Sequence, residues 1–431
     1  MLKESAPRPR ASLRRRMFFI AATAPMLLAV WPAAADIFQD RWKRSGWERP
    51  VASSVAGDPA RAREWEAHPP VGLPTISADN IAPMKAAIKQ YSEIVSKGGW
   101  KPLPVEEMKP GYQGPSLPLL QDRLAASGDL ILQGGYASRF DGYVEAAVQR
   151  FQIRHGITPH GYVDKATALA MNVPAASRLK QLQVNLGRVQ TLSKSAAKRY
   201  VLVNVPAAQI EAVLDNQVVS RHAAVVGKID RQTPLLRSSV HEINFNPYWH
   251  VPQSIVRKDL VPKAREYARK GKDILSTFKI EAYDSSGRKL DSRKINWSSS
   301  AVYGYAYRQL PWEDNSMGFV KINFHNAHAV YMHDTPSKSL FGRNFRAHSS
   351  GCVRVQDVHT LVAWLLEGTE SWDEAAVRAI EQSGDRKDVK LKRQTPVYFA
   401  YVSAWATPDG VVSFRRDLYR RDGVGAAAAA Y

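Results

Sequence analysis

The sequence predicts an α+β multidomain protein, helical in its first half and mostly β in its second. Apolar residues recur at helical spacing in segments between residues 77 and 192, whereas from Arg199 onward runs of β-branched and aromatic residues alternate with turn residues. A chain of 431 residues is too long for one typical domain. Its hydrophobic content of 45%, with 11 Trp and 17 Tyr, suffices for two or three packed modules.

Residues 1–35 have the pattern of a signal peptide that is cleaved after Ala35. A basic region ending in Arg14-Arg15-Arg16 precedes an apolar run from Met17 to Trp31, and small residues follow. Pro25 interrupts the run, which is shorter than the roughly 20 apolar residues of a spanning helix. The arginines approximate a twin-arginine signal, so the export route stays open between the general and the twin-arginine pathways. An uncleaved segment would instead anchor the chain in the membrane.

The charge balance indicates an anionic partner outside the cell interior. Lys and Arg number 60 against 40 Asp and Glu, which gives a formal net charge of +20. Such a surplus suits nucleic acid, but the chain has no recognised nucleic-acid motif and its export signal argues against that class. An anionic cell envelope is the better match, and part of the surplus serves only to keep the surface soluble.

Two amphipathic helices are predicted in the first half. After a Pro-rich stretch from residue 36 to 74, Ser77 can cap a helix that ends at Gly98-Gly99, within an N-terminal and scaffold segment of residues 36–115. A second scaffold helix runs from Ala176 to about Leu192, within 174–198. Their apolar stripes consist of Ile81, Met84, Ile88 and Tyr91, and of Leu179, Leu182, Leu186 and Val189.

Residues 116–173, between these helices, predict a small three-helix domain. Leu119 to Leu124 start the first helix, Val144 to Phe151 form the second, and Asp164 caps a third. The segment resembles the peptidoglycan-binding family in three places, namely Leu120-Gln121-Asp122-Arg123-Leu124, Ala147-Val148-Gln149-Arg150-Phe151-Gln152, and Gly156-Ile157-Thr158-Pro159-His160-Gly161 with Asp164-Lys165-Ala166-Thr167. The resemblance implies binding to the wall; the alternative is a rigid helical spacer without a ligand.

The second half begins with a hairpin-like series of strands. The predicted strands are Tyr200 to Val205, Ile210 to Leu214 and a run from Val218, then Phe319 to Phe324, Ala329 to His333, Val397 to Trp405 and Val411 to Phe414. A basic helical interlude from Ser254 to Thr277, followed by a possible hairpin over Asp284-Ser285-Ser286-Gly287, looks like an insertion. Insertions of this kind often cover functional sites.

Cys352 is the one cysteine of the chain, so in an oxidising compartment it has no intramolecular disulfide partner. A free cysteine is often only a small buried hydrophobe. Here His333 precedes it by nineteen residues, and strand alternation places Tyr331 and His333 on one face. Because a thiol of pKa about 8.5 is only a few per cent thiolate at neutral pH, a nucleophile needs a nearby base. His333 is the candidate, although a strand histidine can equally be structural.

Gly351, directly before the cysteine, permits close approach of the backbone. The N–H groups of Gly351 and Cys352 can then bind the oxyanion of a tetrahedral intermediate, which is worth about 3 to 4 kcal/mol per donor. His348 is open to two interpretations, since it either assists the thiol or lies on the surface.

Residues 199–422 resemble the L,D-transpeptidase catalytic domain, whose signature is a histidine followed by Ser-His-Gly-Cys-x-Arg. Here the second part is Ser349-Ser350-Gly351-Cys352-Val353-Arg354. Further matches are Asn246-Pro247-Tyr248-Trp249, His333-Asp334-Thr335-Pro336, Leu340-Phe341, Arg346-Ala347 and Phe414-Arg415-Arg416-Asp417-Leu418-Tyr419. They indicate the large periplasmic branch, with an inserted peptidoglycan-binding domain, a capping insertion at about 252–310, and here a low-complexity tail at 423–431.

The resemblance implies Cys352 as nucleophile, His333 as general base and later acid, and the main-chain carbonyl of Asp334 as the group that orients the imidazole. Tyr331 and Arg354 would shape the donor site, with Ser350 as a further substrate-binding residue. Two departures stand out. Ser350 replaces the signature histidine, which leaves the proposed dyad whole, and residues 309–318, with Trp312, replace the usual glycine-containing loop, which puts the acceptor side in doubt.

The family reaction needs neither a cofactor nor a metal. The thiol attacks the amide after the L-centre of the third stem residue, terminal D-alanine leaves, and an amine of another stem resolves the thioester into a 3-3 cross-link. The implied partners are peptidoglycan stem peptides and glycan, with other envelope proteins open, and the implied compartment is the periplasm. The same thioester chemistry makes carbapenems candidate covalent inhibitors.

Three alternatives stay open. Water as the acceptor gives an L,D-carboxypeptidase or an endopeptidase, although a covering insertion favours the amine. A zinc amidase would use His325, His328 and His333, but regular alternation puts His328 on the opposite strand face. A non-catalytic peptidoglycan-binding protein would leave the thiol idle.

Overall fold

The computed structural model describes residues 72–132, 135–369 and 371–431. The predicted signal peptide and the Pro-rich stretch up to residue 71 lie outside the described residues. Within the described ranges, no helix combines the length and the apolar character that crossing a membrane requires.

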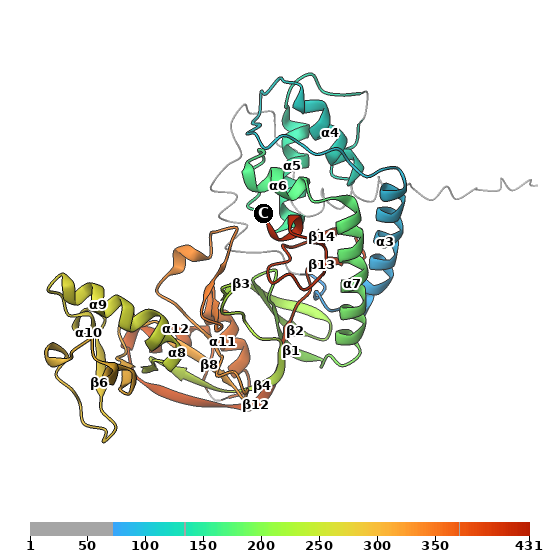
Figure 1. Cartoon of the computed structure of the whole chain (residues 1–431). Helices are drawn as coiled ribbons and strands as arrows, with labels where there is room; N and C mark the ends of the chain where they lie inside the picture. Colours follow the sequence, from blue (N-terminus) through green and yellow to red (C-terminus); the bar gives the residue numbers. More distant parts are fainter. Residues whose placement is uncertain (1–71, 133–134, 370) are drawn as a thin grey trace, which may run out of the picture. The chain divides into compact units, whose positions relative to one another are not determined.

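Two scaffold helices pack side by side, as Figure 1 shows. They are α3 (Ile81–Ser96), preceded by the short turn η1 (Ala78–Asn80), and α7 (Ala175–Ser193). The hydroxyl of Ser77 caps η1 by accepting from the amide of Asp79 at 3.1 Å. Of the predicted stripes, Met84, Tyr91, Leu182 and Val189 are fully buried and the other four residues pack at the edge of the same core. Both predicted helices are confirmed.

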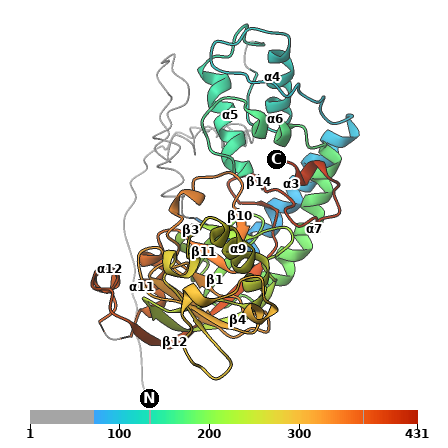
Figure 2. The same ribbon diagram turned by 60° about the vertical axis from the view of Figure 1, so that its left-hand side comes forward.

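The three-helix domain consists of α4 (Ser116–Ala126), α5 (Gly142–His155) and α6 (Lys165–Met171). Asp164 caps α6 by accepting from the amide of Thr167 at 2.7 Å. Leu120, Val148 and Phe151 are buried in its core, which residues of the C-terminal segment also enter. In Figure 2 the C-terminus accordingly lies beside α6.

A nine-stranded sheet, in the order β10-β3-β11-β9-β8-β4-β12-β1-β2, forms the second half. An additional pairing of β2 with β3 closes it into a barrel. The strands are β1 (Arg199–Asn204), β2 (Gln209–Leu214), β3 (Gln217–Gly227), β4 (Leu236–Phe245), β8 (Val320–Phe324), β9 (Met332–His333), β10 (Ala347–Ser349), β11 (Val353–Val355) and β12 (Lys387–Ala400). Its apolar side shares one core with α11 (Val358–Leu366), while β13 (Ala404–Ala406) and β14 (Val412–Phe414) pair apart from it.

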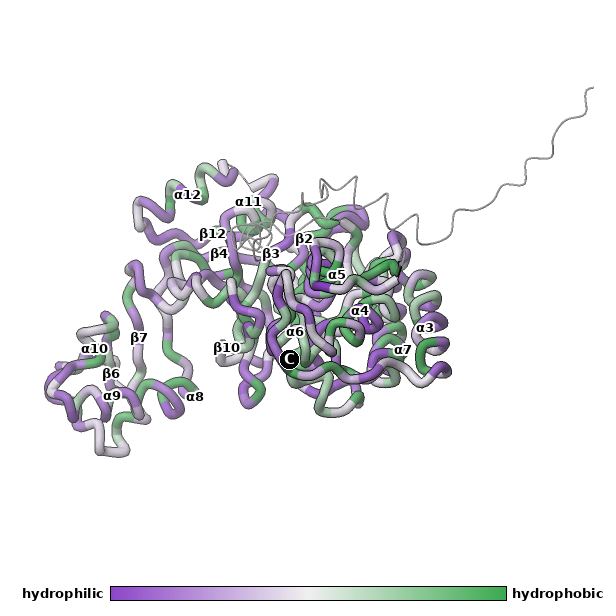
Figure 3. The backbone as a smooth tube through the Cα atoms, turned by 90° about the horizontal axis from the view of Figure 1, so that it is seen from above, coloured by the Kyte–Doolittle hydropathy of each residue, from purple (hydrophilic) through white to green (hydrophobic). Residues whose placement is uncertain are grey.

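The insertion forms a small subdomain with a core of its own, which we call the cap. It contains a three-stranded sheet in the order β5-β7-β6 and several short helices, grouped together in Figure 3. The elements are β5 (Trp249–His250), α8 (Gln253–Ile255), η2 (Val256–Leu260), α9 (Val261–Arg269), α10 (Ile274–Thr277), β6 (Ile280–Tyr283), η3 (Ser292–Lys294), η4 (Ser300–Tyr303) and β7 (Ala306–Gln309).

Several predicted strand bounds are wrong. The turn after β6 closes only one bridge, between Tyr283 and Lys289, because β6 pairs with β7 instead. Ala329 has φ 53°, a left-handed conformation that no strand continues, so β9 is limited to Met332–His333. Strand β12 starts at Lys387, ten residues before the predicted Val397, and ends at Ala400. The helices α11 and α12 (Glu374–Ser383) were not predicted.

Candidate active site

Cys352 lies in a short loop between β10 and β11. Gly351 has φ 120°, in a region that residues with a Cβ rarely adopt. The Ser349 hydroxyl accepts the Gly351 N–H at 3.1 Å and donates to the Cys352 carbonyl at 2.5 Å. Thr233 donates to the Gly351 carbonyl at 2.8 Å from outside the loop. Because the Gly351 amide is engaged, the Cys352 amide is the one of the two predicted oxyanion donors that makes no hydrogen bond within the described residues.

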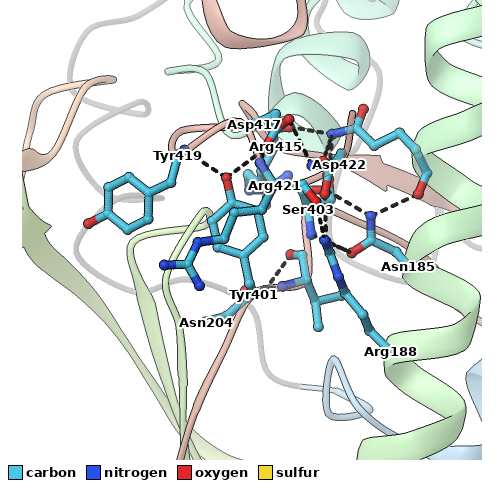
Figure 4. A network of polar contacts seen from close by, with 12 residues as sticks. Asn185, Arg188, Asn204, Tyr401, Ser403, Arg415, Asp417, Tyr419, Arg421 and Asp422 are labelled. Carbon is cyan, nitrogen blue, oxygen red and sulfur yellow. Dashed lines mark hydrogen bonds and ion pairs between the residues drawn. The ribbon is translucent and has the colours of Figure 1, made fainter. Parts of the chain in front are cut away.

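The loop is also tied to the C-terminal segment. Tyr419 donates its hydroxyl to the Gly227 carbonyl at 2.6 Å and accepts the Thr233 amide at 3.1 Å. Figure 4 shows how this series of hydrogen bonds continues. The Tyr401 hydroxyl accepts the Tyr419 amide at 2.8 Å and donates to the Asp417 carboxylate at 2.7 Å. The position of the cysteine loop therefore depends on residues almost seventy positions later in the chain.

The surroundings of the thiol keep it protonated at rest. Burial raises the pKa of Cys352 above its ordinary value, and hydrogen bonding from the Tyr331 amide and phenol with the charges of Lys321 and Arg354 acts in the opposite direction without cancelling burial. The cations nevertheless favour negative charge at this sulfur as soon as it forms.

His333 is buried, with 3% of its surface exposed. Its Nδ1 lies 2.5 Å from the main-chain carbonyl oxygen of Asp334. Because a carbonyl can only accept, Nδ1 carries the proton, and Nε2 is the ring nitrogen without a proton in the neutral imidazole. Burial, and next the charge of Arg354, lowers the pKa of His333 to about 3. The imidazole is thus neutral at physiological pH and able to receive a proton.

The carboxylate of Asp334 lies against the end of the substituted loop 309–318. It accepts the amide of Phe319 at 3.2 Å and pairs with Lys338. Gly318 has φ 58°, and a Cβ there would lie 2.2 Å from the Asp334 carboxylate. Trp312 of this loop lies under the ammonium of Lys279, which is 4.5 Å from the indole ring.

Cross-strand register brings the ionisable side chains together. His333 on β9 stands opposite Arg354 on β11 and opposite Lys321 on β8. The rings of Tyr331 and His333 meet edge to face at 5.7 Å, and the Lys321 ammonium lies 4.7 Å from the Tyr331 ring centroid. Within the described contacts no hydrogen bond joins the Cys352 thiol to the imidazole, although such bonds are often long until a substrate is bound.

Two family models match this chain. Residues 198–377 match the L,D-transpeptidase catalytic domain, and residues 113–171 match the "Putative peptidoglycan binding domain". The chain carries an L,D-transpeptidase catalytic domain. Both resemblances seen in the sequence are thereby confirmed, as is the α+β class with a helical N-terminal region and a β-barrel L,D-transpeptidase domain.

A curated relative, the "Putative L,D-transpeptidase" of Haemophilus influenzae, is 27% identical over 267 residues, which cover 61% of this chain and 53% of the relative. The chain thus spans about half the length of that relative. A solved L,D-transpeptidase of Xylanimonas cellulosilytica is 17% identical, with a TM-score of 0.23, covering 70% of this chain and 100% of that one. One from Stackebrandtia nassauensis is 12% identical, with a TM-score of 0.26, covering 72% and 99%.

Other histidines near the L,D-transpeptidase signature have partners elsewhere. His348 lies 3.0 Å from the Phe345 carbonyl and against its ring. His325 stacks on His241 at 4.1 Å. Among the described residues no three His, Cys, Asp or Glu side chains are grouped as metal ligands, so the set required by the zinc alternative does not assemble there.

Sequence reasoning missed three residues around the L,D-transpeptidase site. Lys321 alternates with buried positions on β8, and that pattern was the available signal. Arg231 donates to the Ser350 hydroxyl at 2.9 Å and forms an ion pair at 2.5 Å with Asp259 of the cap. No sequence signal pairs residues so far apart. Two surface pockets beside the loop after α5 are lined by neither Cys352 nor His333.

Proposed function

We propose that the chain is a cysteine-dependent L,D-transpeptidase that forms 3-3 cross-links between peptidoglycan stems in the periplasm. The observation that carries the proposal is the Cys352 loop beside a neutral His333 and two cations, Lys321 and Arg354. The catalytic domain supplies the reaction class, and the peptidoglycan-binding domain supplies the polymer.

The acylation step follows from the charges. The sulfur of Cys352 bonds to the carbonyl carbon of the third residue while its proton passes to Nε2 of His333, and the Cys352 amide donates to the developing oxyanion. The C–N bond then breaks, and the imidazolium returns the proton to the departing D-alanine amine. With the pKa of His333 near 3 and that of the thiol raised, proton transfer accompanies C–S bond formation, because no stable thiolate–imidazolium pair precedes it.

In deacylation, the amine of a second stem attacks the thioester carbon. His333 accepts the proton of that amine and returns it to the sulfur as the C–S bond breaks, which restores the resting thiol. Water can replace the amine and would give the carboxypeptidase. The Arg231–Asp259 ion pair supports the amine, because it connects the cap to the Ser350 side of the cysteine loop, and a cap held over the thioester would limit the access of water.

A mass-spectrometric assay tests the proposal. The chain from residue 36 and its Cys352→Ala variant are incubated with a disaccharide-tetrapeptide. We expect dimers that lack one terminal alanine, formed only with Cys352 present. Cysteine-dependent tripeptide alone would indicate the carboxypeptidase. No cysteine-dependent product, together with retained binding to sacculi, would indicate the non-catalytic wall-binding protein. Acylation of Cys352 by a carbapenem is a second readout.

A further inference from the structure

A row of polar side chains leads away from the candidate base across the sheet. His333 on β9 stands opposite Lys321 on β8, Lys321 opposite Asn244 on β4, and Asn244 opposite Asp388 on β12. Residues directly opposite share one face, and neighbouring strands are about 4.8 Å apart. The row therefore extends roughly 5, 10 and 14 Å from the imidazole. Beside it, Asn323 stands opposite Glu242.

We propose that Lys321 and Glu242, held by Asn244 and Asn323, form a subsite for the carboxylate and ammonium at the far end of the donor's third residue, the pair that diaminopimelate carries. This inference rests on the proposed function and deepens it, because it assigns the residues that recognise the third residue of the donor stem.

Lys321 provides the cation of the subsite. It is half-buried, and no hydrogen bond or ion pair of its ammonium occurs among the described contacts; its neighbour is the face of the Tyr331 ring. Burial lowers its pKa, while the charges of Cys352, Glu242 and Asp388 act the other way. A half-buried ammonium with unused donors next to the thiol is suited to a ligand carboxylate.

Glu242 provides the anion. It accepts the Asn244 amide at 2.9 Å and the Asn323 amide at 3.4 Å. The Asn244 amide also donates to Asp388 at 2.8 Å, and its oxygen accepts from Asn323 at 2.5 Å. Neither carboxylate forms an ion pair in the described part of the chain, although Lys390 stands opposite Glu242. Amides thus fix two carboxylates and leave acceptor capacity for an ammonium.

The order of charges fits the ligand. In diaminopimelate three methylenes separate the L-centre, whose carbonyl reacts at the thiol, from a carbon that bears both an ammonium and a carboxylate. On the sheet, Lys321 is one strand spacing from His333 and Glu242 lies on the next strand, so the cation and then the carboxylate follow the candidate base in that order. Burial lowers the pKa of His250 on β5, and the charges of Arg308 and Lys321 act in the same direction.

Three donor tetrapeptides that differ only at the third residue test the subsite. They carry diaminopimelate, lysine, which lacks the far carboxylate, or norleucine, which lacks both groups. For Lys321→Met we expect the preference for diaminopimelate over lysine in kcat/KM to fall about tenfold or more, the worth of one charge-assisted hydrogen bond. For Glu242→Gln the preference for lysine over norleucine falls instead. Because each comparison is a ratio of kcat/KM for two donors with the same variant, an effect of the substitution on the thiol itself cancels.

Controls separate the possible failures. Lys321→Arg retains the cation and is expected to keep the ratio, and Lys392→Met, an exposed position on β12, is expected to change nothing. Binding of the tripeptide products to Cys352→Ala, measured by calorimetry, reads the subsite without turnover. Unchanged ratios and affinities in both variants would overturn the subsite. Lys321-dependent affinity without cysteine-dependent turnover would instead retain the subsite and overturn the proposed function.

Discussion

The hydroxyl of Tyr419 is the sharpest place to test how the C-terminal segment holds the cysteine loop. In Tyr419→Phe the Gly227 carbonyl and the Thr233 amide each lose the hydrogen bond described above, at 2.6 and 3.1 Å, and both sites are buried. A buried polar group left unsatisfied costs about 1 to 3 kcal/mol. The two together predict a loss of roughly 2 to 6 kcal/mol in the free energy of unfolding.

Urea unfolding monitored by Trp fluorescence measures this loss, provided that the slope of the free energy of unfolding against urea concentration is the same in the variant and the wild type. Tyr143→Phe is the matched control, because Tyr143 is 69% exposed and its hydroxyl makes no hydrogen bond among the described contacts. The control is expected to stay within about 0.5 kcal/mol of wild type. Since Thr233 also holds Gly351, Tyr419→Phe is further expected to slow acylation of Cys352 in the folded protein. A loss no larger than that of the control would refute the reasoning.

Three further predictions concern charge. Alkylation of Cys352 by iodoacetamide, which reads the thiolate, is expected to rise about tenfold per pH unit from pH 7 to 9, and a plateau near neutrality would contradict the raised pKa. Because the pKa values of His155 and His333 are lowered in the folded protein, the unfolded chain binds more protons than the folded chain below about pH 6.5. The free energy of unfolding is therefore fully present above that pH and falls by roughly 1.4 kcal/mol per pH unit and per histidine below it. Urea unfolding midpoints at pH 7.5 and 5.5 check this prediction. Asp259→Asn weakens the pair with Arg231 and is expected to raise the ratio of tripeptide to dimer, and high salt should act likewise in the wild type only.

Local signals in the sequence were sufficient for the helices of the first half. Caps such as Ser77 and Asp164 and apolar stripes at helical spacing act over a few residues, and the structure has these helices where they were predicted. The strands fared less well. The early start of β12 at Lys387 depends on pairing with β4, which no local pattern records, and the turn after β6 was read as a hairpin although the partner of β6 is β7.

The sequence alone determined the class of domain, through its resemblance to the L,D-transpeptidase signature, and it indicated the candidate chemistry through a lone cysteine after a glycine and a histidine on a predicted strand. It could not show that burial keeps the Cys352 thiol and the His333 imidazole neutral, nor that the Gly351 amide donates to the Ser349 hydroxyl. Those facts depend on desolvation and on cross-strand register. Only the folded barrel brings Lys321, Glu242 and the C-terminal Tyr419 to the same site, since charges and hydrogen bonds act through space over distances that the order of residues does not encode.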